Sequence, residues 1–300
     1  MTVHVVGNAT VDITYRVRQL PRPGETLLAT SRSVDAGGKG LNQAIAAARA
    51  GAAARLITAI GTDAAVAVLR HRLAGEAGLE AVLLEAPEVT DESVIMVADD
   101  GENAIVSTHA CAAWLDGDRA IAALGAVAAG DTLLLQGNLS VAATEACLAQ
   151  GRARGLRTVL NPAPLHSDVG PLLPLVDLVV VNEVEATTIA GIADPAAAAA
   201  AIRGRSGGAV LLTEGARGCR LFQASEGQRF PAPAVPAVDT AGAGDVFTGV
   251  VTARLAGGAS LEAATALAVR AAALAVTRPG TSGSLPTSDE IRALQNEIEG

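Results

Sequence analysis

The stretch DTLLLQG (residues 131–137), followed by LRTVLNP (156–162) and VDLVVVN (176–182), decides the fold of this chain. Each run is short, rich in Val and Leu, and ends in a polar or turn residue, as strands buried on both faces do. A helical segment at 140–154 separates the first two runs. Because β and α units alternate, we expect an α/β fold with a mostly parallel central sheet and helices on both faces.

The same alternation extends toward both ends of the chain. Further strands are expected at 3–7, 54–61, 208–213 and 219–224, with a strand end at 235–238, and further helices at 38–50, 63–78, 182–190, 195–204, 242–257, 260–275 and 287–297. These segments would form one α/β domain over residues 1–300.

Two segments, at about 13–36 and 91–108, do not follow the βα rhythm. Both alternate apolar and polar residues around turns, which predicts half-exposed strand pairs. We expect them to form a small separate sheet that acts as a lid, as in enzymes that must exclude water.

Composition and charge exclude several classes of protein. Half of the 300 residues are apolar, 2% are aromatic, and the net charge of −9 comes with no basic cluster that would suggest a nucleic-acid face. Charges interrupt every apolar stretch, so no membrane span is expected, and the N-terminus does not resemble a signal peptide. Three scattered cysteines without a metal-like spacing favour the reducing cytoplasm.

The segment DAGGKGLNQA (residues 35–44) contains Lys39, the only lysine in the chain. A phosphate-binding P-loop would need Ser or Thr after this lysine, where the chain has glycine. Gly37 and Gly38 would instead open a helix whose N–H groups a ligand can approach. Lys39 and Asn42 are three apart, share a helix face, and would suit a polyhydroxylated ligand. The alternative is a solvated lysine at a turn.

The segment VDTAGAGDVFTG (residues 238–249) predicts a second glycine-led helix start. Gly242 and Gly244 would leave N–H groups free to bind an anion, and Asp245 falls in the first turn. The spacing does not match a dinucleotide fingerprint. We expect Asp245 to be ionised and able to accept a proton from a hydroxyl. The alternative is an aspartate that only stabilises the helix start.

The segment VVVNEVEA (residues 179–186) places Asn182 and Glu185 where a buried strand runs into a helix. At that edge of an open sheet, where ligands bind, an amide and a carboxylate could hold water around Mg²⁺. The alternative is a helix cap with a capping-box glutamate.

Two weaker patterns also lie at predicted strand ends. LTEGARG (residues 212–218) is a strand followed by a glycine-rich turn that could admit a flat base. Thr10 and Asp12 are two apart at the end of the first predicted strand, hence on one face, and could contact substrate hydroxyls. A structural polar pair is the alternative.

With GGKGLNQA near its start and DTAGAGD near its end, the chain resembles the PfkB family of carbohydrate kinases, most closely the ribokinases. LNPAP (160–164), NEVEA (182–186), LTEGARG and TRPG (277–280) extend the resemblance over nearly the whole chain. It implies a ribokinase-like sandwich with a β-sheet lid. The implied activity is transfer of phosphate from ATP to the primary hydroxyl of a small sugar, which would be a pentose, a ketose or a related polyol.

The resemblance also implies roles for individual residues. Asp245 would be the catalytic base, and the N–H groups of Gly242, Ala243 and Gly244 would form an anion hole. The sugar would contact Thr10, Asp12, Gly38, Lys39, Asn42 and Asn138. Mg²⁺ and ATP would be bound by Asn182, Glu185, Thr213, Gly215, Ala216 and Gly218. A K⁺ ion would be held, largely through carbonyl groups, by Asp239, Ala241, Ala275, Arg278, Gly280 and Ser284. Kinases of this type often dimerise through their lids.

Two departures from the family pattern concern the sugar pocket. Ribokinases usually carry Asn where this chain has Thr10, and a sugar-contacting Glu where it has Asn138. An amide both donates and accepts, whereas a carboxylate only accepts, so these two positions speak against D-ribose while the phosphate machinery is unaffected. The alternatives are a nucleoside kinase of the same fold and a non-catalytic sugar sensor.

Overall fold

Nine strands form the main sheet of the computed structural model, which describes residues 1–223 and 227–299. In spatial order they are β13 (Gln228–Phe230), β12 (Cys219–Phe222), β11 (Ala209–Thr213), β10 (Leu178–Asn182), β9 (Arg157–Asn161), β8 (Thr132–Gln136), β1 (Thr2–Val6), β4 (Ala53–Ile60) and β5 (Leu79–Glu85). From β11 to β5 every pair is parallel, whereas β12 and β13 are antiparallel additions at one edge. The predicted mostly parallel α/β sheet is confirmed.

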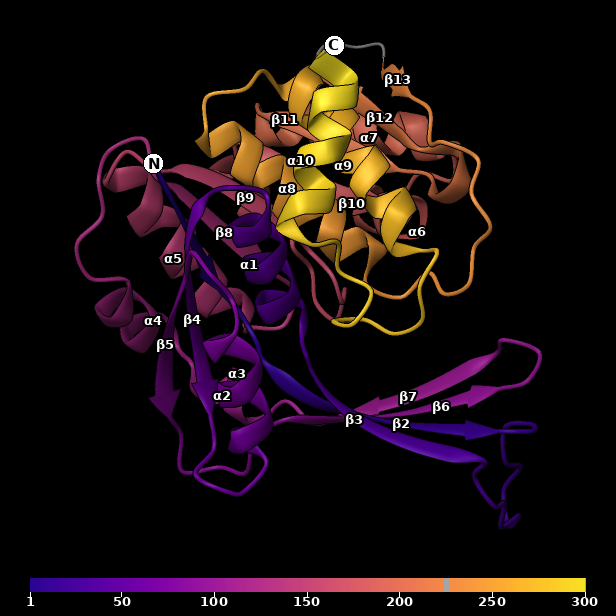
Figure 1. Ribbon diagram of the computed structural model, residues 1–300. Helices are drawn as coiled ribbons and strands as arrows, with labels where there is room; N and C mark the ends of the chain where they lie inside the picture. Colours follow the sequence, from indigo (N-terminus) through magenta and orange to yellow (C-terminus); the bar gives the residue numbers. More distant parts are fainter. Residues whose placement is uncertain (224–226, 300) are drawn as a thin grey trace.

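Helices cover both faces of this sheet (Figure 1). One face is covered by α1 (Lys39–Arg49), α2 (Val66–Ala74), α8 (Ala243–Ala256), α9 (Leu261–Ala275) and α10 (Ser288–Glu299), and the other by α3 (Ala110–Trp114), α4 (Gly117–Leu124), α5 (Val141–Ala153), α6 (Glu183–Ala190) and α7 (Pro195–Ser206). A 3₁₀ helix at Gly170–Leu175 joins the second group. Along β10, side chains alternate between the two apolar cores: Leu178 and Val180 face one, Val179 and Val181 the other. Because both faces of the strand are buried, it is apolar from Leu178 to Val181.

The helices α1 and α8 pack closely against each other near the centre of the molecule. Most residues of both helices are buried, and α8 is apolar apart from Asp245, Thr248, Thr252 and, in its last turn, Arg254. Gly249 allows the close approach, because a Cβ added there would lie 2.5 Å from the carbonyl oxygen of Gln43 and 2.6 Å from Cβ of Ala46. The starts of the two glycine-led helices are therefore held side by side.

The second sheet projects from the body as a lid (Figure 1). Within the described part of the chain it consists of β3 (Ser31–Gly37), β2 (Thr10–Val17), β6 (Glu92–Ala98) and β7 (Asn103–Ser107), in that order. β2 is antiparallel to β3 and parallel to β6, and β6 and β7 form a hairpin. These strands lie in or close to the two segments from which the lid was predicted.

Several local expectations are wrong. Residues 235–238 do not form a strand; instead, the Val238 N–H donates to the carbonyl of Val276 at 2.8 Å. The predicted strand at 219–224 ends at Phe222, and residue 224 lies outside the described residues. The segments that form β5, α3, α4 and β13 were not assigned from the sequence. Within the described residues, no helix is both long and apolar enough to cross a lipid bilayer.

Candidate active site

Polar side chains end four neighbouring strands of the main sheet. Gln136 ends β8, Asn161 ends β9, Asn182 ends β10 and Thr213 ends β11. Gln136 lies opposite Asn161, and Asn182 lies opposite Thr213. Because the carboxyl ends of parallel strands meet at one edge of a sheet, the four residues form a polar row where open α/β folds bind ligands.

The start of α1 lies against the loop that follows β1. The Gly40 N–H donates to Oδ1 of Asn8 at 3.3 Å, and the Leu41 N–H donates to the Asn8 carbonyl at 3.1 Å. A Cβ added at Gly38 or Gly40 would lie within 3.0 Å of the backbone of this loop. The sequence interpretation was therefore incomplete: these glycines admit the chain's own backbone, and Asn8 already occupies two of the first N–H groups.

The start of α8 is more open. Gly242 is the N-cap with φ of 79°, a backbone conformation that favours glycine. A Cβ added at Gly244 would meet nothing within 4 Å. Among residues 1–223 and 227–299, no acceptor lies within hydrogen-bond range of the Gly244 N–H, whereas the Ala243 N–H has a long contact of 3.4 Å with the Thr240 carbonyl. This helix start can accommodate an anion.

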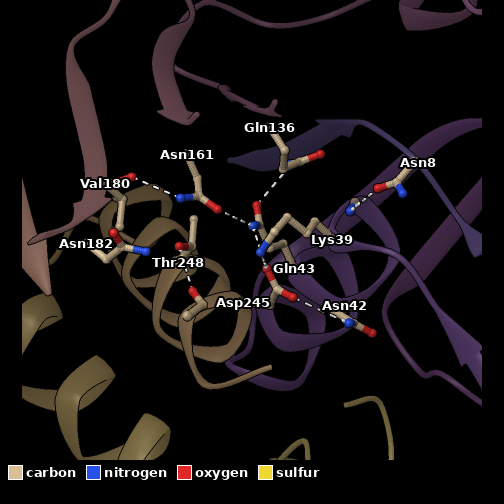
Figure 2. Close-up of polar contacts among 12 residues, drawn as sticks. Asn8, Lys39, Asn42, Gln43, Gln136, Asn161, Val180, Asn182, Asp245 and Thr248 are labelled. Carbon is tan, nitrogen blue, oxygen red and sulfur yellow. Dashed lines mark hydrogen bonds and ion pairs between the residues drawn. The ribbon is translucent and has the colours of Figure 1, made fainter. Parts of the chain in front are cut away.

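Asp245 lies at this helix start and faces the side chains of α1 (Figure 2). It is only 4% exposed. Its Oδ1 accepts from Nε2 of Gln43 at 2.9 Å and from Nζ of Lys39 at 3.3 Å, and its Oδ2 lies 3.4 Å from Nδ2 of Asn42. The structure therefore brings Lys39, Asn42 and Asp245 together.

A chain of buried amides supports this carboxylate, and the sequence interpretation missed it (Figure 2). Nε2 of Gln43 also donates to Oδ1 of Asn161 at 2.9 Å, and Nδ2 of Asn161 donates to the carbonyl of Val180 at 2.9 Å. Nε2 of Gln136 donates to Oε1 of Gln43 at 2.9 Å. The sequence contains two features that could have identified these amides. Gln43 is four residues after Lys39, on the same helix face. Gln136 and Asn161 each end an apolar run.

Asp12 and Thr10 lie in β2 of the lid, not at the end of the first strand as predicted. Oδ1 of Asp12 accepts from the Thr10 hydroxyl at 2.9 Å, and its Oδ2 accepts from the Thr281 hydroxyl at 3.2 Å. Burial raises the pKa of Asp12, and hydrogen bonds from Thr10, Thr281 and Ser93 oppose that shift. A Cβ added at Gly37 would lie 2.1 Å from the Asp12 carboxylate, so this glycine makes room for it.

Asn42 and Asn138, like Gln136, each carry a side-chain oxygen that is buried near the carboxyl edge without a partner in the described part of the chain. Among the described residues, Oδ1 of Asn42 and Oδ1 of Asn138 accept no hydrogen bond. Asn138 follows β8, two residues beyond Gln136. A buried acceptor left without a donor is costly, so both atoms suit a hydroxylated ligand.

Asn182 and Glu185 form a complete capping box at the start of α6. Oδ1 of Asn182 accepts from the Glu185 N–H at 2.8 Å, and Oε2 of Glu185 accepts from the Asn182 N–H at 2.9 Å. Burial raises the pKa of Glu185, and nearby Lys39 lowers it. Capping does not exclude metal organisation, because carboxylate oxygens keep further lone pairs. In the described part of the chain, no group of three or more His, Cys, Asp or Glu side chains is arranged to hold a metal ion.

The predicted nucleotide residues follow β11, beside this cap. The hydroxyl of Thr213 donates to the Val181 carbonyl at 3.3 Å. Gly215, with φ of 58°, begins a 3₁₀ helix (Gly215–Arg217) that includes Ala216, and a Cβ added at Gly215 would meet open space. Gly218 does not: a Cβ there would lie 2.0 Å from the Phe230 carbonyl, so packing of β13 requires this glycine.

Buried Glu214, which the sequence left without an interpretation, pairs with Arg220 of β12. Its carboxylate oxygens lie 2.6 and 3.0 Å from the Arg220 guanidinium nitrogens. The pair therefore joins β12 to the turn that follows β11.

The residues predicted to hold K⁺ lie in the loops before α8 and after α9. Oδ1 of Asp239 accepts from the Ala241 N–H at 2.9 Å, and its Oδ2 accepts from the Gly280 N–H at 2.9 Å. Asp239 thus joins the two loops, and the Ala275 carbonyl already accepts from the Arg278 N–H at 3.1 Å. Ala275 ends α9, and the Ser284 hydroxyl donates to the Thr281 carbonyl at 2.8 Å. The Arg278 side chain points to Glu290 instead, so only its carbonyl fits the set.

Known proteins resemble this chain over nearly its whole length. The model of the pfkB family carbohydrate kinases matches residues 2–288. The ribokinase of Haemophilus influenzae is 31% identical, covering 96% of each chain. The crystal structure of ribokinase from Thermotoga maritima has a TM-score of 0.88 at 28% identity and covers 98% of this chain and 99% of that chain. Arabidopsis thaliana ribokinase, solved with ribose and ATP, has a TM-score of 0.83 at 25% identity, covering 98% of each chain.

The fold is ribokinase-like, and the enzyme is a sugar kinase. The chain belongs to the pfkB family of carbohydrate kinases.

Proposed function

We propose that this kinase transfers the γ-phosphoryl group of ATP to the primary hydroxyl of a pentose or a closely related small sugar. The observation that carries the proposal is the position of Asp245, buried at the open start of α8 and surrounded by Lys39, Asn42 and Gln43. The similarity to ribokinases, one of them solved with ribose and ATP, supports the same substrate class.

In the proposed reaction Asp245 accepts the proton of the primary hydroxyl. The hydroxyl oxygen forms a bond to the γ-phosphorus while the bond from that phosphorus to the β–γ bridging oxygen breaks, and ADP leaves with that electron pair. The N–H groups of Gly242, Ala243 and Gly244 would stabilise the charge that develops on the transferred group. The open space at Gly244 supports this role, because only a residue without a side chain leaves it free.

The sugar would lie between the lid and α1, contacting Thr10, Asp12, Gly38, Lys39, Asn42 and Asn138. Asp12 brings a carboxylate that already accepts from two hydroxyls, a chemistry suited to further sugar hydroxyls. The unpartnered oxygens of Asn42 and Asn138 call for donors. An Asn at 138, where ribokinases carry Glu, offers a donor as well as an acceptor. We therefore propose a sugar whose hydroxyl pattern differs from that of D-ribose.

ATP would extend along the carboxyl edge toward Thr213, Gly215, Ala216 and Gly218. Asn182, which lies opposite Thr213 in the β10–β11 pairing, and Glu185 would organise the waters of Mg²⁺. That ion would neutralise phosphate charge. K⁺ would lie between the loops that Asp239 joins, with carbonyls of Ala241, Ala275, Arg278, Gly280 and Ser284 around it.

We also propose that two copies pair through their lids. Val34, Val94 and Val106 are exposed, and the strand register places them in one row with Ile13. Asp12, the neighbour of Ile13 on β2, points to the other face. A second lid would cover this apolar row.

The three buried, unpaired cysteines support a reducing cytoplasmic location.

The direct test is a coupled ADP-release assay with pentoses, 2-deoxypentoses, hexoses, ketoses, polyols and nucleosides, each with and without K⁺. We expect turnover of one small-sugar class, faster with K⁺ present. Preferred turnover of a nucleoside would overturn the sugar assignment, and the absence of sugar-dependent ADP release would overturn the proposed reaction.

A further inference from the structure

The hydrogen-bond pattern around Asp245 differs between its two carboxylate oxygens. Oδ1 accepts a bond of 2.9 Å from Gln43 and a second of 3.3 Å from Lys39, whereas Oδ2 has only the 3.4 Å contact with Asn42. One oxygen is thus held and the other is left open to a new partner. The substrate hydroxyl would have to approach the open one.

The orientation of the Gln43 amide is fixed by a chain of bonds that begins at a backbone carbonyl. The carbonyl of Val180 can only accept, so Asn161 must present its NH₂ group there and its Oδ1 toward Gln43. Gln43 must then present its own NH₂ group. One hydrogen goes to Asn161 and the other to Asp245.

Gln136 completes the arrangement from the other side. Its Nε2 donates to Oε1 of Gln43 at 2.9 Å. Rotating the Gln43 amide by 180° would place two acceptors against each other at Asn161 and at Asp245, and two donors against each other at Gln136. Gln43 is fully buried and Gln136 is 1% exposed. Water therefore cannot replace these bonds at low cost.

We propose that Gln43 is a positioning residue for phosphoryl transfer. It donates to Oδ1 of Asp245 and holds that oxygen, so that Oδ2 is the oxygen that receives the hydroxyl proton. Asn161, held by the Val180 carbonyl, acts through Gln43 by fixing which end of its amide faces the base. This inference rests on the proposed role of Asp245 as that base.

The test is the pH dependence of kcat/KM for the best sugar in wild type, Gln43→Leu and Gln43→Glu. Loss of the donor favours the protonated carboxyl, so the acidic limb should move up by about one pH unit in Gln43→Leu. A carboxylate in place of the amide should move it further. At pH values below this shifted acidic limb, kcat should fall, while the KM for ATP should stay within about twofold of wild type.

Asn161→Leu should move the limb in the same direction by less, and should add little when combined with Gln43→Leu, because the two residues act in series. Thr252→Val is the matched control. The buried Thr252 hydroxyl donates to the Thr248 carbonyl within α8, about two helix turns from Asp245. It should lower the melting temperature and leave the limb unchanged. If Gln43→Leu does not fold, Gln43→Met removes the same donor with an unbranched side chain.

An acidic limb that stays in place in the Gln43 variants, with kcat reduced or not, would overturn the proposal. Asp245→Asn in the same assay distinguishes failure of the positioning role of Gln43 from failure of the proposed reaction. If Asp245→Asn is inactive but Gln43 does not move the limb, only the positioning role fails. If Asp245→Asn remains active, the proposed reaction itself fails.

Discussion

Gly249→Ala tests whether the contact between α1 and α8 sets the geometry of the site. The added Cβ would lie 2.5 Å from the Gln43 carbonyl oxygen and 2.6 Å from Cβ of Ala46, where ordinary contacts begin near 3.4 Å. The helices must therefore separate by about 1 Å to restore normal van der Waals distances. Such overpacking costs about 1–3 kcal/mol, and the better helix propensity of Ala offsets about 1 kcal/mol of it.

The same shift would lengthen the contacts between α1 and the base. The Gln43–Asp245 bond of 2.9 Å and the Lys39–Asp245 contact of 3.3 Å would both stretch beyond hydrogen-bond range. A misplacement of about 1 Å far from the chemistry can cost about a hundredfold in rate. We expect kcat to fall about 10–100-fold in the coupled ADP-release assay, with a melting temperature a few degrees lower by circular dichroism.

Gly204→Ala is the matched control. This glycine lies within α7, and a Cβ added there would meet nothing within 4 Å. The change should stabilise the protein by about 0.5–1 kcal/mol and leave kcat unchanged. If Gly249→Ala keeps wild-type kcat and stability, close packing of the two helices does not position the base.

Three further predictions concern single residues. Lys39→Arg should raise the KM for the sugar about tenfold and the KM for ATP much less. The bulkier guanidinium would lose one charge-assisted hydrogen bond to the sugar, at a cost of about 1.4 kcal/mol. Equal effects on both KM values would contradict the placement of Lys39 in the sugar pocket. Asn138→Glu should shift the ratio of kcat/KM values toward D-ribose in a competition assay, and an unchanged ratio would remove Asn138 from the sugar pocket. Arg278 lowers the pKa of Glu290 to about 2 from 4.5, so this pair stabilises the fold above pH 4.5 and loses its effect as the pH falls toward 2. Since the Glu290 side chain is 35% exposed, Glu290→Gln should cost only about 1 kcal/mol at pH 7 in urea unfolding, with no difference from wild type near pH 2.

The fold follows from the sequence because its signals are local. Apolar runs such as LLL before Gln136 and VVV before Asn182 specify buried parallel strands, and the lid segments show a different period. β5 and the short helices α3 and α4 were missed because they lie between stronger patterns. Residues 235–238 have strand-like composition, but Val238 bonds to the loop after α9 instead of to a sheet.

The site is less accessible to sequence reasoning because its contacts join distant parts of the chain. The two glycine-led helix starts were recognisable, and the structure places Lys39 against Asp245. Nothing local indicates that Gly38 and Gly40 face the backbone after β1, since the opposing atoms come from Asn8 and its neighbours. The sequence around Gln43 likewise does not indicate that its side chain contacts Asn161, which lies more than a hundred residues away along the chain.

For Asn182 and Glu185, the sequence could not distinguish between two roles. The sequence left open whether they form a helix cap or a metal-organising pair. The structure contains the cap, and it also places Glu185 close enough to Lys39 and Asp245 for both charges to affect its pKa. One pair of residues can serve the helix and the site, so the two interpretations do not compete.

We propose that Asp245 removes the proton from the sugar hydroxyl, and the Asp245→Asn variant is the decisive test. Calorimetric titration with a non-hydrolysable ATP analogue and with the sugar should give dissociation constants within about threefold of wild type, while kcat falls at least a hundredfold, the scale of a lost general base. A variant that binds both ligands and still turns over at a rate near that of wild type would contradict the account.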